Sequence, residues 1–183
     1  MTIHLGTPYD LDTVMRLKGA CVLRMQQMNI DQWDEAYPNR ISFEEDINQG
    51  NLYLYSLDDL LIACAVLNEN QDSEYQEVNW AYHAENIAVI HRLMVHPEYW
   101  GKGIASKLMS SIENIAVSMG YSIIRLDAFL KNPSAISLYT KLGYRHAGKV
   151  AFRKGQFMCF EKRIDGVSAV DFEKHGITVM HSA

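Results

Sequence analysis

The sequence lacks the features of membrane-spanning, disulfide-stabilised and nucleic-acid-binding proteins. Its longest apolar run covers residues 60–67, far fewer than the roughly 20 residues that cross a bilayer. Three cysteines, odd in number and far apart, indicate neither a disulfide framework nor a zinc site. The formal net charge is −5 and lysine and arginine form no cluster, so we expect no nucleic-acid partner. We also expect no membrane partner and no metal.

The chain does contain enough apolar material for one folded core. Of its 183 residues, 48% are apolar, and its periodic segments can bury a core without disulfides or metal. A secretion signal has a basic segment followed by an apolar run, and the N-terminus does not show this pattern. These patterns predict a cytoplasmic protein with one domain over residues 1–164, followed by a C-terminal tail, residues 165–183, of unassigned structure.

The most informative segment is residues 90–109, IHRLMVHPEYWGKGIASKLM, in which an apolar strand leads through two glycines into an amphipathic helix. Gly101 and Gly103 can adopt dihedrals that other residues avoid, and they let the main chain approach a ligand closely. The following helix directs unpaired N–H groups and its positive dipole end at the same place. The segment predicts a turn that binds an anionic cofactor, with a tight strand-to-helix turn as the structural alternative.

Two common phosphate-binding motifs do not fit this segment. A P-loop requires Gly-x-x-x-x-Gly-Lys-Ser/Thr, whereas Lys102 is followed by Gly103 and no hydroxyl is placed to hold magnesium. A dinucleotide fingerprint requires a third glycine where Ser106 stands. Neither nucleotide hydrolysis nor dinucleotide binding is therefore indicated.

Downstream, residues 122–129 are typical of a strand and residues 132–144 of a short helix. Pro133 suits the first helical turn, apolar residues recur at helical spacing, and Gly143 ends the helix. Together with the earlier segment, these motifs resemble the GCN5-related N-acetyltransferase (GNAT) family. In order, the motifs are Val95-x-Pro97, Gly101-Lys102-Gly103-Ile104-Ala105, Asn132-x-x-Ala135 and Leu138-Tyr139-x-Lys141-Leu142-Gly143-Tyr144.

The resemblance implies an α/β (α+β) fold with a mixed, mostly antiparallel central sheet, a splayed parallel strand pair and helices on both faces. In that family the pantetheine arm of acetyl coenzyme A (acetyl-CoA) lies between the splayed strands, and main-chain amides hold the pyrophosphate. One position departs, because Trp100 stands where the family has arginine or glutamine. The positions matching cofactor-binding ones are Leu93, Met94, Val95, Gly101, Lys102, Gly103, Ile104, Ala105, Ser106, Asn132 and Tyr139.

The chemistry that the resemblance implies is acyl transfer from a thioester to an amine. Backbone N–H groups near Met94 would stabilise the negative charge that develops on the carbonyl oxygen. Tyr139 would give a proton to the departing sulfur, and a core aromatic on a helix is the structural alternative. Asn132 would hydrogen-bond the cofactor arm or main chain, and Asn-Pro turn chemistry is its alternative.

No motif identifies the general base. His91 shares a strand face with Leu93 and Val95, and imidazole has a suitable intrinsic pKa. Glu85, just upstream, could act through water. The structural alternatives are a hydrogen-bonded packing histidine and an exposed carboxylate, so His91 and Glu85 are both candidates.

The remaining segments show ordinary secondary-structure patterns. A second helix is expected from Ser42, as its N-cap, to Gly50. Residues 68–86 form a long loop that is either mobile or a substrate wall, and the aromatic and acidic residues 32–38 either suit a cationic ligand or anchor a loop. The other expected elements are a helix over residues 10–28 and strands over residues 2–5, 52–57, 60–67, 144–152 and 156–164.

Two functions are consistent with these patterns. The leading hypothesis is an N-acetyltransferase that moves the acetyl group from acetyl-CoA to a primary amine of a small molecule or peptide, by direct attack in a ternary complex. The alternative is a noncatalytic acyl-CoA-binding or sensing module, suggested by Trp100 and the unassigned base. A homodimer formed through the C-terminal strands is compatible with either function.

Overall fold

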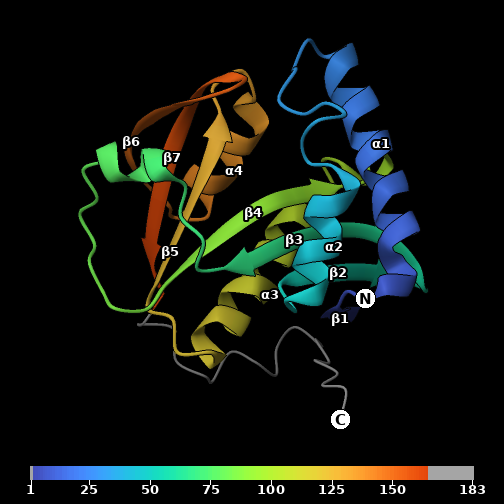
Figure 1. The fold of residues 1–183 in the computed structure, drawn as a ribbon, viewed down its shortest axis with the longest axis horizontal. Coiled ribbons are helices and arrows are strands. Elements are labelled where there is room, and N and C mark those ends of the chain that lie inside the picture. The colour runs from blue at the N-terminus through green and yellow to red at the C-terminus, as the bar shows by residue number, and fades with distance from the viewer. Residues whose placement is uncertain (1, 165–183) are drawn as a thin grey trace.

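The computed structural model describes residues 2–164, so the predicted tail at residues 165–183 lies outside the described residues. Figure 1 shows a central sheet with helices packed against it. Helices α1 (Leu11–Gln27) and α2 (Arg40–Asn48) cover one face, and α3 (Ile104–Ser118) and α4 (Pro133–Lys141) cover the other. The strands are β1 (Thr2–Leu5), β2 (Leu52–Leu57), β3 (Leu60–Asn68), β4 (Ile87–Val95), β5 (Ile123–Phe129), β6 (Arg145–Phe152) and β7 (Gly155–Arg163).

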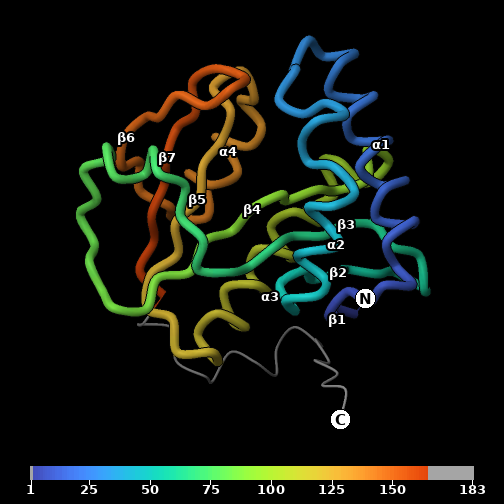
Figure 2. Tube along the Cα trace, in the orientation of Figure 1, coloured from blue at the N-terminus to red at the C-terminus, as the bar shows by residue number. Residues whose placement is uncertain are grey.

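The sheet has the strand order β1-β2-β3-β4-β5-β7-β6, and β4 and β5 are its parallel neighbours. These two strands pair only from Ile87 with Ile123 to Val89 with Arg125. Past that point they diverge, as the chain trace in Figure 2 shows. The edge of β4 that faces β5 is therefore open from Ile90 onward. The predicted mixed, mostly antiparallel sheet with a splayed parallel pair is confirmed.

A bulge in β4 accompanies this split. Val66 of β3 lies opposite His91, but Cys64 lies opposite Met94, so β4 carries one extra residue between these pairs. Arg92, inside the bulge, has a left-handed φ of 51°. An extra residue bends a strand and increases its twist. We attribute the divergence of β4 from β5 to this bend.

The apolar side chains divide between the two faces by strand alternation. Cys64 and Val66 of β3 pack with α1 and α2, whereas Ala63 and Ala65 pack with α3. The three cysteines of the chain are buried and free. Within residues 2–164 no helix is long and apolar enough to cross a membrane, and no group of three or more potential metal ligands is found there.

Most of the predicted elements form, and one predicted cap is wrong. Asp58 and Asp59 join β2 to β3 with left-handed φ values of 48° and 64°, the conformation that a two-residue type I′ hairpin turn requires. Helix α2 begins at Arg40 rather than after Ser42. Asn39 is its cap, because its side chain accepts a hydrogen bond of 2.9 Å from the Ser42 amide.

Residues 69–86 are tied to the sheet. The fully buried carboxylate of Glu161 on β7 accepts hydrogen bonds from the amides of Ala81 and Tyr82 at 2.9 and 3.1 Å. The buried guanidinium of Arg125 on β5 donates to the Tyr82 carbonyl at 3.1 Å. These bonds hold the end of the segment against β5 and β7.

Candidate active site

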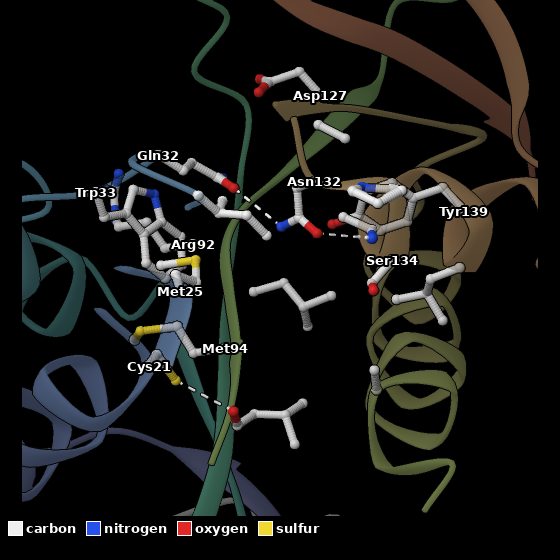
Figure 3. Close-up of a pocket in the computed structure, with 18 of the residues that line it drawn as sticks. Cys21, Met25, Gln32, Trp33, Arg92, Met94, Asp127, Asn132, Ser134 and Tyr139 are labelled. Atoms are coloured by element: carbon white, nitrogen blue, oxygen red, sulfur yellow. Dashed lines mark hydrogen bonds between the residues drawn. The ribbon is translucent and has the colours of Figure 1, made fainter. Parts of the chain in front are cut away.

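A cavity of about 1010 Å³ lies in the split between β4 and β5. Its walls come from β4, the turn before α3, the start of α4 and the segment between α1 and α2. Figure 3 shows Cys21, Met25 and Met94 on one side, with Asn132 and Tyr139 facing them from the other. A cavity of this size is at the upper end of the range for ligand pockets, so it has room for an extended cofactor arm and a small acceptor.

The turn before α3 has the open main chain that the sequence predicts. Gly101 and Gly103 have left-handed φ values of 73° and 76°, which glycine adopts without strain. Gly103 is the N-cap of α3, and no side chain within residues 2–164 caps this helix. Ile104, Ala105 and Ser106 line the cavity, and amides of a first helical turn have no intrahelical acceptor. Such a helix start attracts a phosphate group.

The side chains around this turn make contacts within the protein. Trp100 Nε1 donates to the Val95 carbonyl at 2.6 Å, and the Cys21 thiol donates to the same oxygen at 3.2 Å. Burial raises the pKa of the Cys21 thiol to about 12, so it stays protonated. Lys102 Nζ lies 5.2 Å from the centroid of the Tyr99 ring, and Lys102 is outside the cavity wall. The departure at Trp100 therefore stabilises the turn and leaves any phosphate to the main-chain amides.

The register of β4 determines which peptide groups face the cavity. The His96 amide donates to the Ile62 carbonyl on β3 at 2.8 Å. Because hydrogen-bonding direction alternates along an antiparallel strand, the Met94 peptide groups also face β3, and those of Leu93 and Val95 face the cavity. Near Met94, where the oxyanion donor is predicted, the N–H on the open side is thus that of Leu93.

Tyr139 is both a core aromatic and part of the cavity wall. Its side chain is 6% exposed, and its ring meets those of Tyr144 and Phe160 edge-on, with centroids 6.0 and 5.7 Å apart. Burial raises the pKa of Tyr139, and the negative charge of Asp127 adds to the effect. The hydroxyl therefore stays protonated and can donate to an anionic atom in the cavity.

Asn132 caps α4 and links it to the other side of the cavity. Its side-chain oxygen accepts a hydrogen bond of 3.2 Å from the Ala135 amide, and its nitrogen donates to Gln32 Oε1 at 3.2 Å. The main-chain role, one of the alternatives from the sequence, is thus present. Figure 3 shows both bonds, which fix the Asn132 side chain.

The two candidate bases differ in position. His91 lines the cavity, and its Nε2 lies 3.1 Å from Asn68 Oδ1 and 3.0 Å from the Asn70 carbonyl. Both partners accept, which assigns the proton to Nε2. Burial lowers the pKa of His91 to about 4, so the ring is neutral near pH 7. Glu85 is exposed before β4, at the end away from the split, and the structure does not bring it to the cavity.

A further carboxyl group lies on the cavity wall at Asp127 of β5, past the last position paired with β4. Its Oδ2 accepts a hydrogen bond of 2.8 Å from the buried Tyr75 hydroxyl. Burial raises the pKa of Asp127 to about 6, and the Tyr75 hydrogen bond opposes that rise. A carboxyl group with such a pKa can accept a proton near neutral pH.

The arrangement of these elements matches a known family. A sequence model of the Acetyltransferase (GNAT) family matches residues 22–144, which include the split strands, the glycine turn, α3 and α4. The chain belongs to the GNAT acetyltransferase family. The resemblance seen in the motifs is confirmed, and membership supports acetyl transfer as the general activity and acetyl-CoA as the general donor.

Solved GNAT structures share the fold. A GNAT acetyltransferase from Streptococcus agalactiae 2603 has a TM-score of 0.79 and 24% identity, over 88% of this chain and 94% of its own. A Staphylococcus aureus Mu50 protein assigned as an acetyltransferase has a TM-score of 0.71 and 27% identity, over 90% and 99%. The ribosomal-protein-S18-alanine N-acetyltransferase of Escherichia coli has a TM-score of 0.67 and 14% identity, over 92% and 96%.

In this GNAT chain an ion cluster crosses the cavity. Both terminal nitrogens of Arg153 lie 2.9 Å from the Asp34 carboxylate, and so does Lys154 Nζ. These cations hold the pKa of Asp34 well below its usual range. Asp34 belongs to the segment between α1 and α2, and its partners form the turn between β6 and β7. We call these three residues the roof bridge.

The sequence reasoning did not single out Asp127 or the roof bridge. A signal for Asp127 was available, because it is an acidic residue inside a strand whose alternate positions, Ile124, Leu126 and Ala128, are apolar. The roof bridge joins residues more than 100 positions apart, since Asp34 and Arg153 are separated by 119. No local pattern reports such a contact.

Proposed function

We propose that this protein is an acetyl-CoA-dependent N-acetyltransferase acting on a primary amine by direct attack in a ternary complex. The observation that carries the proposal is the cavity in the split sheet, which has an uncapped helix start at one end and Asp127 and Tyr139 on its walls. A cofactor and an acceptor that share one cavity can react without a covalent enzyme intermediate.

The residues present fit acetyl-CoA, which supplies an activated acetyl thioester when bound. The free amides at residues 104–106 and the left-handed Gly101 and Gly103 suit its pyrophosphate. The peptide groups of Leu93 and Val95 on the open edge of β4 suit its amide-containing arm. Because the Val95 carbonyl already accepts from Trp100, its amide is the group left for the arm.

Asp127 is the proposed general base. It lines the cavity, and a pKa of about 6 keeps it ionised at neutral pH and able to take the proton of an ammonium group. The neutral amine then forms a bond with the thioester carbonyl carbon. The Leu93 N–H donates to the carbonyl oxygen, where negative charge develops.

Tyr139 is the proposed acid. As the carbon–sulfur bond breaks, its hydroxyl donates a proton to the leaving sulfur. The acylated nitrogen gives up its second proton to solvent, which also takes the proton from Asp127 and restores that of Tyr139. Its packing against Tyr144 and Phe160 fixes the ring and so the direction of the hydroxyl. His91 is neutral and bound to Asn68 and Asn70, so we assign it the support of the wall rather than proton transfer.

The test is thiol release from acetyl-CoA over a panel of primary amines, with cofactor binding measured by calorimetry. We expect turnover above background, and we expect Asp127→Asn to lower kcat by roughly 10²-fold or more with unchanged cofactor affinity. Tight cofactor binding without turnover of any amine would instead favour the noncatalytic acyl-CoA module. The Trp100 side chain bonded to β4 is the observation that motivates that second candidate.

A further inference from the structure

The two ends of the cavity differ in charge. The end at α3 presents free amides, which suit an anionic cofactor. The other end carries Asp72 and Asp127, which lie close enough for the charge of Asp72 to raise the pKa of Asp127. The part of the cavity left for the acceptor is therefore acidic.

The positive groups at the acceptor end are already committed. Arg92 donates from Nε and Nη2 to Asp46 at 2.9 and 2.7 Å, and from Nη1 to the Tyr37 hydroxyl at 2.8 Å. The ring of His91 is neutral near pH 7. Arg153 and Lys154 also line the cavity, and both are already paired with Asp34. Each of these three cations therefore has a carboxylate partner before an acceptor binds.

The carboxylates, in contrast, have free oxygens. Asp127 uses Oδ2 for the Tyr75 hydroxyl, and no hydrogen bond to its Oδ1 forms within residues 2–164. Asp72 stands exposed on the wall before the 3-10 helix Ser73–Glu77, and its side chain does not cap that helix. Burial of Asp127 removes water that would otherwise screen a charge placed beside it.

The roof bridge limits the size of the acceptor. Asp34 holds Arg153 and Lys154 across the cavity, and Gln32 holds Asn132 at 3.2 Å. Both links run from the segment between α1 and α2 to the half of the molecule that contains α4 and β6. A polypeptide laid across the cavity would have to break them, whereas a small molecule can lie beneath them.

We propose that the acceptor is a small cationic amine with no carboxylate next to its amino group, held by Asp72 and Asp127. This inference rests on the proposed N-acetyltransferase function. An α-amino acid would place its own carboxylate beside these two aspartates, and Arg92, Arg153 and Lys154 are already paired with other carboxylates. A like-charge contact of this kind is unfavourable, and it selects against amino acids as acceptors.

The experiment compares acceptors that differ only by a carboxylate. The pairs are tyramine with tyrosine, tryptamine with tryptophan and agmatine with arginine, together with a short peptide that has a free N-terminal alanine. Thiol release at saturating acetyl-CoA gives kcat/KM for each. We expect at least one amine to be acetylated about 10²-fold more efficiently than its carboxylated partner, with the peptide also far below it.

Asp72→Asn provides the second measurement. It should raise KM for the preferred amine and reduce the preference over the amino acid about tenfold, because one of the two opposing charges is gone. Glu77→Gln removes a carboxylate from the 3-10 helix that follows Asp72, outside the cavity wall, and should leave both values unchanged.

The outcomes separate this inference from the proposed function. If an amino acid or the peptide is acetylated as well as the amines, the acceptor inference is overturned and the N-acetyltransferase function stands. If no acceptor of any kind releases thiol above background, the function itself fails and the inference with it. An Asp72→Asn variant with an unchanged preference removes Asp72 from acceptor binding.

Discussion

At the scale of single residues, the feature that most affects the proposed chemistry is the pair of Tyr75 and Asp127. The Tyr75 hydroxyl donates to the Asp127 carboxylate at 2.8 Å, and Tyr75 is 2% exposed. A hydrogen bond to the ionised form favours it, so Tyr75 lowers a pKa that burial raises. Tyr75 is therefore a positioning residue that tunes the proposed base.

Tyr75→Phe should move the acid limb of the pH–rate profile to higher pH. A base must be deprotonated to act, so the rate falls as pH drops through the Asp127 pKa, near 6 in the wild type. Without the Tyr75 hydroxyl that pKa rises, and the loss of kcat should be larger at pH 6 than at pH 8. Tyr121→Phe, which removes a hydroxyl bonded to Glu69 at 3.0 Å outside the cavity wall, serves as the control. Equal losses at both pH values would contradict the tuning role.

Tyr139→Phe should lower kcat by roughly 10²-fold, the scale of one proton-transfer group, and leave the Kd for coenzyme A unchanged. The ring remains, so its packing against Tyr144 and Phe160 is preserved. Tyr9→Phe, at a side chain that is 96% exposed, controls for the loss of a hydroxyl. An unchanged kcat would remove Tyr139 from the role of acid.

At the scale of elements, local sequence patterns predicted the helices and turns that local interactions stabilise. Pro133 and Gly143 indicate where α4 begins and ends, and the glycines before α3 indicate where α3 begins. The sequence pattern placed the cap of α2 at Ser42, but serine and asparagine are both favourable cap residues. The Asn39 side chain accepts a hydrogen bond from the Ser42 amide, which makes Asn39 the cap. The bulge at Arg92 depends on the register between β3 and β4, which no single segment contains. For the same reason, the sequence did not indicate that the N–H of Leu93, rather than that of Met94, lies on the open side of β4.

Helix α3 allows a matched test of its N-terminal turn. Gly103 and Gly120 flank it with φ values of 76° and 87°, and an added Cβ meets no atom within 4 Å at either place. Substituting either glycine by alanine should therefore destabilise the fold by a similar amount, about 1–2 kcal/mol, from backbone strain alone. Gly103→Ala should also weaken coenzyme A binding, measured by calorimetry, because Gly103 lines the cavity and Gly120 does not. Equal weakening by both variants would show that the effect is global.

At the scale of the whole molecule, two halves meet along a short line. One half carries β1 to β4 with α1 and α2, and the other carries β5 to β7 with α4, as Figure 1 shows. The sheet joins them over the three paired positions from Val89 back to Ile87. On the other side of the cavity the roof bridge and the bond between Gln32 and Asn132 connect them again. The cavity thus lies between two connections, the main-chain pairing of β4 with β5 and the side-chain contacts of the roof bridge and the Gln32–Asn132 bond.

Asp34→Asn should loosen this second connection. Loss of its charge weakens the contacts to Arg153 and Lys154, so we expect faster amide hydrogen exchange in residues 28–39 and a several-fold lower kcat/KM for a small amine. The Kd for coenzyme A should not change, because the amides at the start of α3 lie apart from the bridge. High salt should have a similar effect on the wild type, since these ion pairs are exposed to solvent.

Asp12→Asn is the matched control for the bridge. It breaks an exposed pair with Arg40, 2.7 Å apart, that links α1 to α2 within one half of the molecule. If both variants changed exchange and kcat/KM alike, the loss of a surface charge would be the cause. If only Asp34→Asn did, the enclosure of the cavity depends on contacts between its two halves. Acceptor access would then be governed by three side chains that do not belong to the cofactor site.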